Sequence, residues 1–493
     1  MGAPRRAADR GLRRRRPGPW PGAGRGPAAG GRGRISARGP AGAGRPAGRV
    51  NPRRAAYEVL TGLERGPHLE TLLGRALASA PARERAFATS LIFGVLRNRL
   101  YLDHLLAACL DRPLHKLDPP VVAVLRLGAA ELACMSTPDF AAVSAAVELA
   151  QATPARRGQT LINAVLRKLA RGWRDVPLPA VEADPAAHLA VRFSHPLWLV
   201  QELLAQWPAE FVQAWLAANQ APSPLTLRAN TLKTTRDDLA ARLAGSAESV
   251  APHHLTPEGL VLRGATAPAA ELPGFKEGLF QVQDAAAQAV SHLLGLRPGL
   301  AVADLCAGAG GKAGHLVALL GGGPGLVAVE PSPGRVRALR DNLNRLGVEG
   351  ARIRQADALT LTGLGPFDRV LVDAPCSALG VAGRRPDVRW RRAPQDPPRL
   401  AALQLALCTR AADLLAPGGA LLYCTCTVTR AENAGVAAAL LAARPELRLE
   451  WPQDLAAPLG ACIGPDGFFR SFPHQQQSDA FFAARLVRKF RKT

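Results

Sequence analysis

Paired cysteines are missing from this sequence, because none of its eight cysteines has Cys-x-x-Cys spacing. Disulfide frameworks are typical of short secreted chains, and structural zinc sites need closely spaced ligands. We therefore expect free thiols, a reducing compartment and no metal site. Long apolar runs are also missing, since no stretch reaches the roughly 20 residues that cross a bilayer. The basic N-terminus lacks the apolar segment of a secretory signal. These absences predict a cytoplasmic protein with no membrane partner.

Acidic residues are scarce relative to basic ones: 39 against 62, for a formal net charge of +23. This balance favours a polyanionic partner, most simply nucleic acid. Thirteen arginines and a single acidic residue, Asp9, lie within residues 1–49, so about half of the net charge is there. We expect residues 1–51 to be a disordered Arg/Gly/Pro-rich tail, because they have too few large apolar side chains to form a core. The tail is either an RNA-binding arm or a dispensable extension.

The residues from 52 to 171 have helical periodicity without strand-like alternation. Apolar residues recur there at helical spacing in Leu91, Val95, Leu102 and Leu106. Asp118-Pro119-Pro120 is typical of a helix start. We expect residues 172–274 to form a connecting RNA-binding subdomain with one short strand at Leu225–Asn230. From 275 to 488, short apolar strands alternate with helices. The sequence therefore predicts a multidomain protein, with an all-helical domain followed by a Rossmann-like doubly wound α/β domain.

A glycine-rich turn follows the first strand of the α/β domain. The expected strand Ala301–Leu305 is followed by Cys306-Ala307-Gly308-Ala309-Gly310-Gly311-Lys312 and then by a helix. Glycines at this position let a ligand approach the backbone at a helix N-terminus. A P-loop is excluded because Cys306 and Ala313 stand where it needs Gly and Ser or Thr. The glycine spacing also fits a dinucleotide dehydrogenase poorly.

Carboxylates end the next two expected strands. Glu330 follows Leu326–Val329 and is suited to a ribose diol, and Asp357 follows Arg352–Arg354 and is suited to an adenine amino group. Contacts to ribose and adenine without a pyrophosphate cradle point to S-adenosylmethionine as the cofactor.

The fourth and fifth expected strands, Arg369–Val372 and Ala420–Tyr423, are followed by a carboxylate and several thiols. Asp373 and Cys376 follow the fourth strand, and Cys424 and Cys426 follow the fifth. Open α/β sheets bind ligands at the carboxyl ends of their strands, so we expect these side chains to converge on the cofactor.

Three of these segments resemble motifs of the Sun/Nop-type RNA cytosine-5 methyltransferases. They are Asp304–Lys312, Asp373–Ser377, and Tyr423–Asn433 with its Glu432-Asn433 pair. Weaker similarity lies in Gln281–Asp284, Gly380–Trp390 and Ser478–Leu486. In the helical domain, Arg53–Ala56, Val124–Ala129 and Ile162–Arg167 resemble the NusB-type RNA-binding module. A NusB-like domain ahead of such a catalytic domain is the arrangement of the RsmB-type 16S ribosomal RNA methyltransferases. The resemblance covers about residues 52–488.

The resemblance implies a role for each motif residue. Cys306, Ala307, Gly308, Ala309, Gly310, Gly311 and Lys312 would line the cofactor, with Glu330 at the ribose, Asp357 near the adenine, and Asp373 beside cofactor and target base. Cys426 matches the nucleophile and Cys376 the cysteine that helps to release product. Ala309 and Ala378 depart from the Pro and Gly usual in the family. Cys424 receives no role.

The chemistry explains why two cysteines are needed. Thiolate attack at carbon 6 of cytosine makes carbon 5 nucleophilic, and the proton of carbon 5 must later leave with the thiolate. The target base must also leave its stack. Arginines 384, 385, 389, 391 and 392 surround Trp390, and we interpret this cluster as an RNA contact. The basic end, Arg485–Lys492, is interpreted as solvated.

The leading hypothesis is a monomeric enzyme that methylates carbon 5 of a cytosine in 16S ribosomal RNA and does not act on DNA. A transfer RNA substrate stays open as an alternative, as does a noncatalytic RNA-binding or ribosome-assembly factor. An amino-group methyltransferase is disfavoured because Asp373-Ala374-Pro375-Cys376 replaces its Asn/Asp-Pro-Pro-aromatic turn.

Overall fold

The computed structural model describes residues 51–66 and 68–489. The tail expected over residues 1–51 lies outside the described residues apart from Asn51. The Asn51 side chain accepts hydrogen bonds from the backbone N–H groups of Arg53 (3.0 Å) and Arg54 (3.2 Å) and so caps the first helix. Pro52 suits the first helical position because it has no N–H to leave unpaired.

The chain divides into two compact units. The first comprises the described residues up to Val95 together with Leu105–Asp175, and it is helical throughout. Its elements are α1 (Pro52–Leu63), α2 (Leu69–Leu77), most of α3 (Ala82–Ala107), η1 (Leu114–Lys116), α4 (Pro119–Cys134), α5 (Asp139–Gln151), η2 (Pro154–Gly158), α6 (Gln159–Gly172) and η3 (Trp173–Asp175). In α6, Ile162, Val165, Leu166 and Leu169 are buried, which is the spacing of one helix face.

The second unit comprises Leu96–His104 of α3 and the described residues from Val176 on. It begins with α7 (Pro185–Arg192), α8 (Leu197–Leu204) and α9 (Ala209–Ala218). An antiparallel sheet follows in the order β2 (Ser249–Pro252), β3 (Gly259–Arg263), β1 (Leu225–Ala229), β4 (Phe280–Val282), with α10 (Arg236–Arg242) and η4 (Ala269–Glu271). The sequence predicted only one strand, at Leu225–Asn230, before residue 275. Strands β2 and β3 were not predicted; they have only four and five residues, too few for a clear alternation.

The larger sheet has the order β10 (Leu447–Leu449), β12 (Phe481–Arg488), β9 (Leu415–Thr425), β8 (Phe367–Asp373), β5 (Val302–Asp304), β6 (Leu326–Val329), β7 (Arg352–Arg354), and β11 (Phe469–Ser471) pairs with β12. The strands β7, β6, β5, β8 and β9 are adjacent in the sheet and parallel to one another. Strand β12 is antiparallel to β9, β10 and β11. The expected Rossmann-like domain after a helical domain is confirmed.

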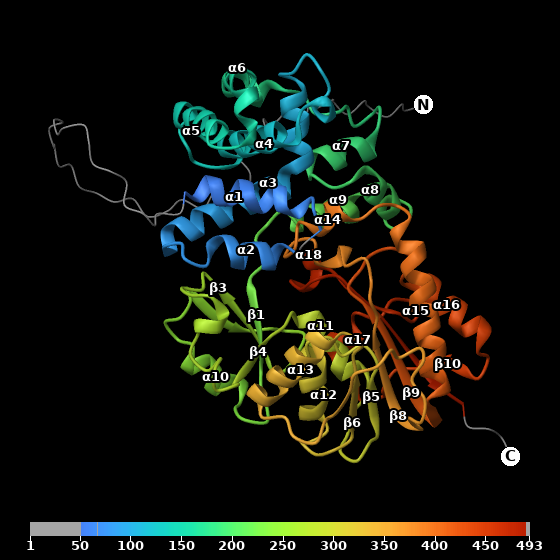
Figure 1. The fold of residues 1–493 in the computed structure, drawn as a ribbon. Coiled ribbons are helices and arrows are strands. Elements are labelled where there is room, and N and C mark those ends of the chain that lie inside the picture. Colours follow the sequence, from blue (N-terminus) through green and yellow to red (C-terminus); the bar gives the residue numbers. More distant parts are fainter. Residues whose placement is uncertain (1–50, 67, 490–493) are drawn as a thin grey trace, which may run out of the picture. The chain divides into compact units, whose positions relative to one another are not determined.

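Helices cover both faces of this sheet (Figure 1). On one face lie α11 (Ala285–Leu293), α12 (Gly311–Leu319) and α13 (Pro333–Leu346), and on the other lie α15 (Asp396–Asp413) and α16 (Ala434–Ala443). The shorter helical pieces are η5 (Leu379–Val381), α14 (Val388–Arg391), α17 (Ala457–Gly460) and α18 (Pro473–Gln476). Alternate strand residues enter opposite cores: Leu422 and Cys424 pack toward α12, whereas Leu421 and Tyr423 pack toward α15.

The parallel register brings the carboxyl ends of β5, β6, β7, β8 and β9 to one edge of the sheet. β5 lies between β6 and β8, so the direction of strand succession reverses there, and such switch points open a crevice for ligands. Within the described part of the chain, no helix combines the length and apolar character needed to cross a membrane.

Candidate active site

The glycine loop, Cys306–Lys312, connects β5 to α12. Gly310 is left-handed (φ 84°) and stands immediately before α12. A Cβ atom at Gly310 would lie 2.6 Å from Cδ1 of Leu339 in α13, so only glycine lets the loop pass this close to that helix. The N–H of Ala307 donates to the carbonyl of Val329 (3.0 Å), which fixes the loop against the end of β6.

Glu330 and Asp357 lie at the ends of the neighbouring strands β6 and β7. Glu330 is 3% exposed, and its carboxylate accepts hydrogen bonds from the N–H groups of Gly308 (3.1 Å) and Ser332 (2.9 Å). Asp357 is exposed, and one of its oxygens accepts from the N–H of Leu359 (2.9 Å). A carboxylate oxygen has a second acceptor site, so both side chains can still accept hydrogen bonds from a ligand. Their assignment to ribose and adenine stays a prediction.

Lys312 and Asp373 join the glycine loop to the end of β8. Nζ of Lys312 lies 2.5 Å from Oδ2 of Asp373. Burial opposes the lysine's charge, but the Asp373 carboxylate outweighs it and raises the pKa of Lys312, so the side chain is an ammonium. The ammonium also lies 5.3 Å from the ring centre of Phe481, a cation–π contact.

The two family-motif cysteines face each other. Cys376 follows β8 and Cys426 follows β9, and because these strands are parallel neighbours their ends bring the sulfur atoms to 3.4 Å. The hydrogen bond with Cys376, followed by burial, raises the pKa of Cys426 well above its usual value. The charge of Lys312 opposes this rise. Two thiols this close do not ionise together, so one serves as hydrogen-bond donor to the other.

Cys424, to which the sequence analysis assigned no role, has a defined hydrogen-bond partner. It lies two residues before Cys426, on the sheet face that packs toward α12, and its thiol donates to Oδ1 of Asp373 (3.5 Å). Burial and the charge of Asp373 raise the pKa of Cys424 well above its usual value, so it is a neutral donor. The alternation of side chains along β9 is the signal that would have predicted this position.

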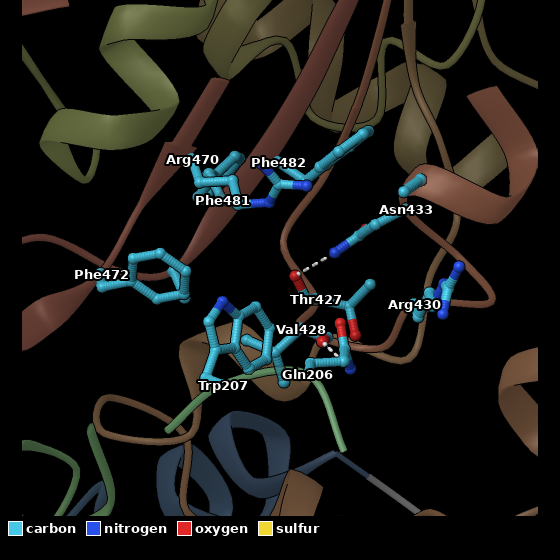
Figure 2. A pocket seen from close by; sticks show the side chains of 12 residues that line it. Gln206, Trp207, Thr427, Val428, Arg430, Asn433, Arg470, Phe472, Phe481 and Phe482 are labelled. Carbon is cyan, nitrogen blue, oxygen red and sulfur yellow. Dashed lines mark hydrogen bonds between the residues drawn. The ribbon is translucent and has the colours of Figure 1, made fainter. Parts of the chain in front are cut away.

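A small cavity lies beside Thr427 and Val428 (Figure 2). It is lined by Gln206, Trp207, Thr427, Val428, Arg430, Asn433, Ala434, Arg470, Phe472, Ala480, Phe481 and Phe482. Its volume of about 20 Å³ suits a water molecule rather than a nucleobase.

Comparisons with known protein families match three parts of the chain. The profile of the 16S rRNA methyltransferase RsmB/F family matches residues 291–487, that of the NusB family residues 50–171, and that of the RsmF/B-like ferredoxin-like domain residues 195–268. Ribosomal RNA small subunit methyltransferase B of Sodalis glossinidius (strain morsitans) is 36% identical over 439 residues, which cover 88% of this chain and 97% of that protein. The chain belongs to the ribosomal RNA small subunit methyltransferase B family.

Other members and relatives agree with this assignment. The methyltransferase B of Pseudomonas putida is 36% identical, covering 85% of this chain and 97% of that protein. Among solved structures, PH0851 is 24% identical with a TM-score of 0.76 and covers 88% of this chain and 98% of that chain. NSun6 from Pyrococcus horikoshii with SFG is 22% identical with a TM-score of 0.53, over 58% of this chain and 97% of that chain. At these identities, the two structures support the fold alone.

In this member of the methyltransferase B family, one arginine of the cluster that the sequence suggested as an RNA contact is inaccessible. Arg389 is fully buried and donates to the carbonyls of Ser194 (3.2 Å) and Asn219 (2.7 Å). Nε1 of Trp390 donates to the carbonyl of Leu96 (2.7 Å).

Arg384 and Arg392 are also engaged within the protein. Arg384 pairs with Asp284 (3.0 Å) and Asp479 (3.3 Å), and Arg392 donates to the carbonyl of Ser377 (2.8 Å). The interpretation is wrong for Arg389, because the packing of distant segments buries it.

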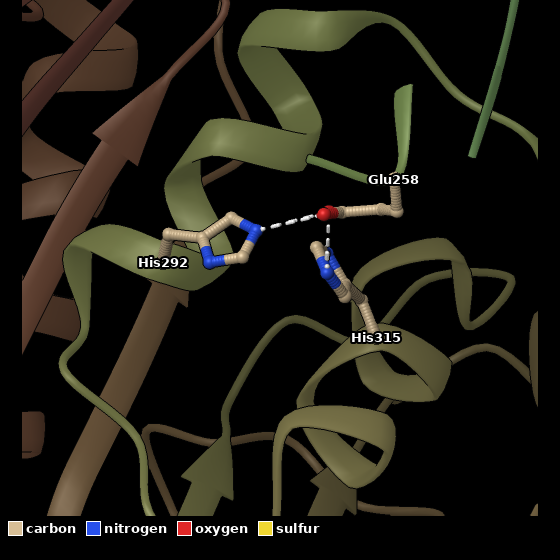
Figure 3. A group of neighbouring side chains, drawn as sticks. All are labelled: Glu258, His292 and His315. Atoms are coloured by element: carbon tan, nitrogen blue, oxygen red, sulfur yellow. Dashed lines mark hydrogen bonds and ion pairs between the residues drawn. The ribbon is translucent and has the colours of Figure 1, made fainter. Parts of the chain in front are cut away.

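A second polar cluster lies on the α11–α13 face of the methyltransferase sheet (Figure 3). Glu258 accepts from Nε2 of His292 (3.0 Å) and from Nε2 of His315 (2.8 Å). Donor atoms this close can hold a metal ion, but metal-bound histidine normally donates its other ring N–H to an acceptor, and Nδ1 of His315 has none among the described residues. We therefore describe the cluster as a junction between Glu258, which precedes β3, and the helices α11 and α12.

Proposed function

We propose that this protein is an S-adenosylmethionine-dependent methyltransferase that modifies carbon 5 of a cytosine in 16S ribosomal RNA through a covalent bond from Cys426. The observation that carries the proposal is the 3.4 Å contact between Cys376 and Cys426, beside the Lys312–Asp373 pair. Methylation at an amino group or an oxygen needs no second thiol. Two opposed thiols suit a reaction in which a covalent adduct forms and must then be released.

The residues of the glycine loop fit the proposed cofactor. Apart from its chain neighbours and the backbone of its own helix, no heavy atom of the described residues would lie within 4 Å of a Cβ at Gly311, which leaves open space at the start of α12. Glu330 and Asp357 provide carboxylates at the two adjacent strand ends. S-adenosylmethionine bound there would supply an electrophilic methyl group on a positively charged sulfonium.

Cys426 forms the covalent bond to carbon 6 of the target cytosine. Before the attack the Cys426 proton passes to solvent, and the charge of Lys312 stabilises the resulting thiolate. The bond breaks the conjugation of the ring and makes carbon 5 the nucleophilic centre. Lys312 and Asp373 offer an ammonium and a carboxylate, which can donate to and accept from the polar edge of the ring.

Cys376 has the role of releasing the product. After methylation, carbon 5 carries a proton that must pass to a base while the bond between carbon 6 and Cys426 breaks and its electron pair returns to the sulfur. The Cys376 sulfur lies 3.4 Å from the Cys426 sulfur, within reach of the same ring. Once its own proton has passed to solvent, the Cys376 sulfur can accept the proton from carbon 5.

The ribosomal substrate is supported by the family membership and by the names of the relatives. Bisulfite sequencing of ribosomal and transfer RNA from a deletion strain tests it. We expect a single cytosine of 16S ribosomal RNA to lose its modification. Loss of the modification in a transfer RNA alone would show that transfer RNA, not ribosomal RNA, is the substrate. No loss of modification in any RNA would support a noncatalytic role.

The mechanism is tested with purified Cys426→Ala and Cys376→Ala proteins. We expect Cys426→Ala to lower kcat by at least about 10³-fold while cofactor affinity stays within about twofold, because the nucleophile is lost and the glycine loop is intact. Cys376→Ala should accumulate a protein–RNA adduct that survives denaturing electrophoresis.

Cys408→Ala is the matched control, because this thiol is buried between α15 and the sheet, outside the site. It should turn over normally. Turnover by Cys426→Ala near that of the unmodified protein would rule out the nucleophile assignment, and absence of any adduct with Cys376→Ala would rule out the release role.

A further inference from the structure

A buried carboxylate lies beneath the two cysteines. Glu432 is 0% exposed and accepts five hydrogen bonds. The donors are the N–H (2.7 Å) and hydroxyl (2.5 Å) of Ser377, Nε2 of Gln404 (3.1 Å), and the hydroxyls of Thr427 (3.4 Å) and Thr429 (2.9 Å). Burying a carboxylate is costly unless donors surround it, and hydrogen bonds to an ionised acceptor are the stronger kind.

The donors come from the two segments that hold the thiols. Ser377 directly follows Cys376, and Thr427 directly follows Cys426. The hydroxyls of Ser377 and Thr427 are themselves 2.6 Å apart. One carboxylate thus connects the residue after each cysteine, across 50 positions of sequence.

The neighbouring Asn433 fixes the Cys426 segment from both sides. The hydroxyl of Thr425 donates to Oδ1 of Asn433 (2.6 Å), and Nδ2 of Asn433 donates to the carbonyl of Thr427 (3.1 Å). The Tyr423 hydroxyl donates to the Glu432 carbonyl and lies 3.0 Å from Oε1 of Gln404. The position of Cys426 is therefore determined by residues on both sides of it.

We propose that Glu432 is a positioning residue that sets the separation of the two thiols by holding the segments that follow Cys376 and Cys426. Its effect on turnover rests on the proposed function, because the spacing matters there for forming and then releasing the adduct. Glu432 acts through Ser377 and Thr427 rather than on the RNA. A small displacement of a reacting group greatly lowers the reaction rate, so a change in the distance between the two thiols should lower kcat.

The separation of the Cys376 and Cys426 thiols can be tested without RNA, by measuring how readily they form a disulfide. Glutathione disulfide oxidises the thiols of Cys376 and Cys426 to one intramolecular disulfide and is itself reduced to two glutathione thiols. The sulfurs must move from 3.4 Å to about 2.05 Å. The equilibrium constant, read by mass spectrometry of the linked peptides, gives the effective concentration of one thiol at the other.

We expect Glu432→Ala to lower this effective concentration by at least about tenfold, because both segments gain freedom. Glu432→Gln should stay within about threefold of the unmodified protein, since its amide oxygen can still accept from Ser377 and Gln404 and the hydroxyls can turn to accept from its NH₂. In a methylation assay, Glu432→Ala should lower kcat while KM for S-adenosylmethionine stays within about twofold, because none of the donors to Glu432 belongs to the glycine loop.

Glu258→Gln is the matched control, because Glu258 is a comparably buried carboxylate (4% exposed) whose partners lie away from the cysteines. It should leave the effective concentration unchanged. An unchanged or raised value in Glu432→Ala overturns the proposal, even if its thermal stability falls. If Glu432→Ala does not fold, Thr429→Val, which removes a single donor, should show a smaller decrease, and no decrease overturns the proposal. Absence of methylation in the unmodified protein would contradict the proposed function but would leave the disulfide measurement decisive for Glu432.

Discussion

Asp304, at the end of β5, has an unusual ionisation state for an aspartate. It is 1% exposed, and its carboxylate accepts a hydrogen bond from the N–H of Cys306 (3.2 Å). Burial and the charge of Asp373 raise the pKa of Asp304 to about 7, from an ordinary value of 3.8. The strand that leads into the glycine loop therefore ends at a carboxyl group that is partly protonated near neutral pH.

This pKa predicts a pH-dependent effect of Asp304→Asn on stability. Below the unfolded-state pKa the carboxyl group is protonated in both states, so its charge costs nothing. As pH rises from about 4 to about 7, the Asp304 carboxyl group ionises in the unfolded chain but stays largely protonated in the folded chain. The unmodified protein therefore loses stability, by at most about 4 kcal/mol. Asparagine keeps the acceptor oxygen and removes that loss.

Urea unfolding at about pH 5 and about pH 8 measures this difference. We expect the advantage of Asp304→Asn in the free energy of unfolding to be larger at the higher pH. An advantage that does not change with pH would show that the carboxyl group ionises normally in the folded protein.

Among the elements, the β5–α12 connection is the one in which a backbone conformation decides the site. Gly310 combines a left-handed φ of 84° with close packing against Leu339, which is fully buried in α13. A side chain at position 310 would meet both a conformational penalty and a steric overlap. The loop would have to move away from α13 and with it the N-terminus of α12.

Gly310→Ala is therefore expected to weaken binding of S-adenosylmethionine by at least about tenfold, because the displaced loop no longer presents the same backbone groups. Isothermal titration measures the affinity. Gly334→Ala in α13 is the control, since among the described residues beyond its own helix and chain neighbours no atom would lie within 4 Å of the added Cβ, and alanine favours a helix. Equal affinities for the two variants would contradict the role assigned to the loop.

At the scale of the whole molecule, the compact unit that contains the methyltransferase sheet includes a segment from far earlier in the chain. Leu96–His104 of α3 belongs to this unit. Arg389 connects this α3 segment to the rest of the unit, because its guanidinium donates to the carbonyls of Arg97 (3.4 Å), Ser194 (3.2 Å) and Ala382 (3.2 Å). Burial and the charge of Arg97 lower the pKa of Arg389 to about 9, but it remains charged at neutral pH.

Arg389→Met in the full chain should lower the free energy of unfolding by about 3 kcal/mol, because several buried carbonyls lose a charged donor. RNA affinity should be unchanged, since the guanidinium is inaccessible. Arg399→Met is the control, because that side chain is 72% exposed and its pair with Asp396 contributes little. Thermal denaturation measures the expected loss of stability, and RNA filter binding measures the expected unchanged RNA affinity. Normal stability with weakened RNA binding would restore the interpretation of Arg389 as an RNA contact.

The sequence alone determined the fold class and the approximate place of the site. Strand-and-helix alternation predicts the parallel sheet, and the ends of parallel strands must meet at one edge, so Glu330, Asp357, Asp373 and Cys426 could be placed together without coordinates. The motifs that resemble the Sun/Nop-type enzymes are short, continuous segments, and for that reason they could be recognised in the sequence.

Only the tertiary structure decided which side chains touch. The Cys376–Cys426 contact and the bonds of Glu432 to Ser377 span about 50 residues, and no local pattern encodes a distance of that kind. The burial of Arg389 was equally inaccessible, because an arginine in a basic loop looks solvated until distant segments such as Leu96–His104 pack over it. Local physics fixes strands and helices, whereas the pairing of charges and thiols depends on which distant segments meet.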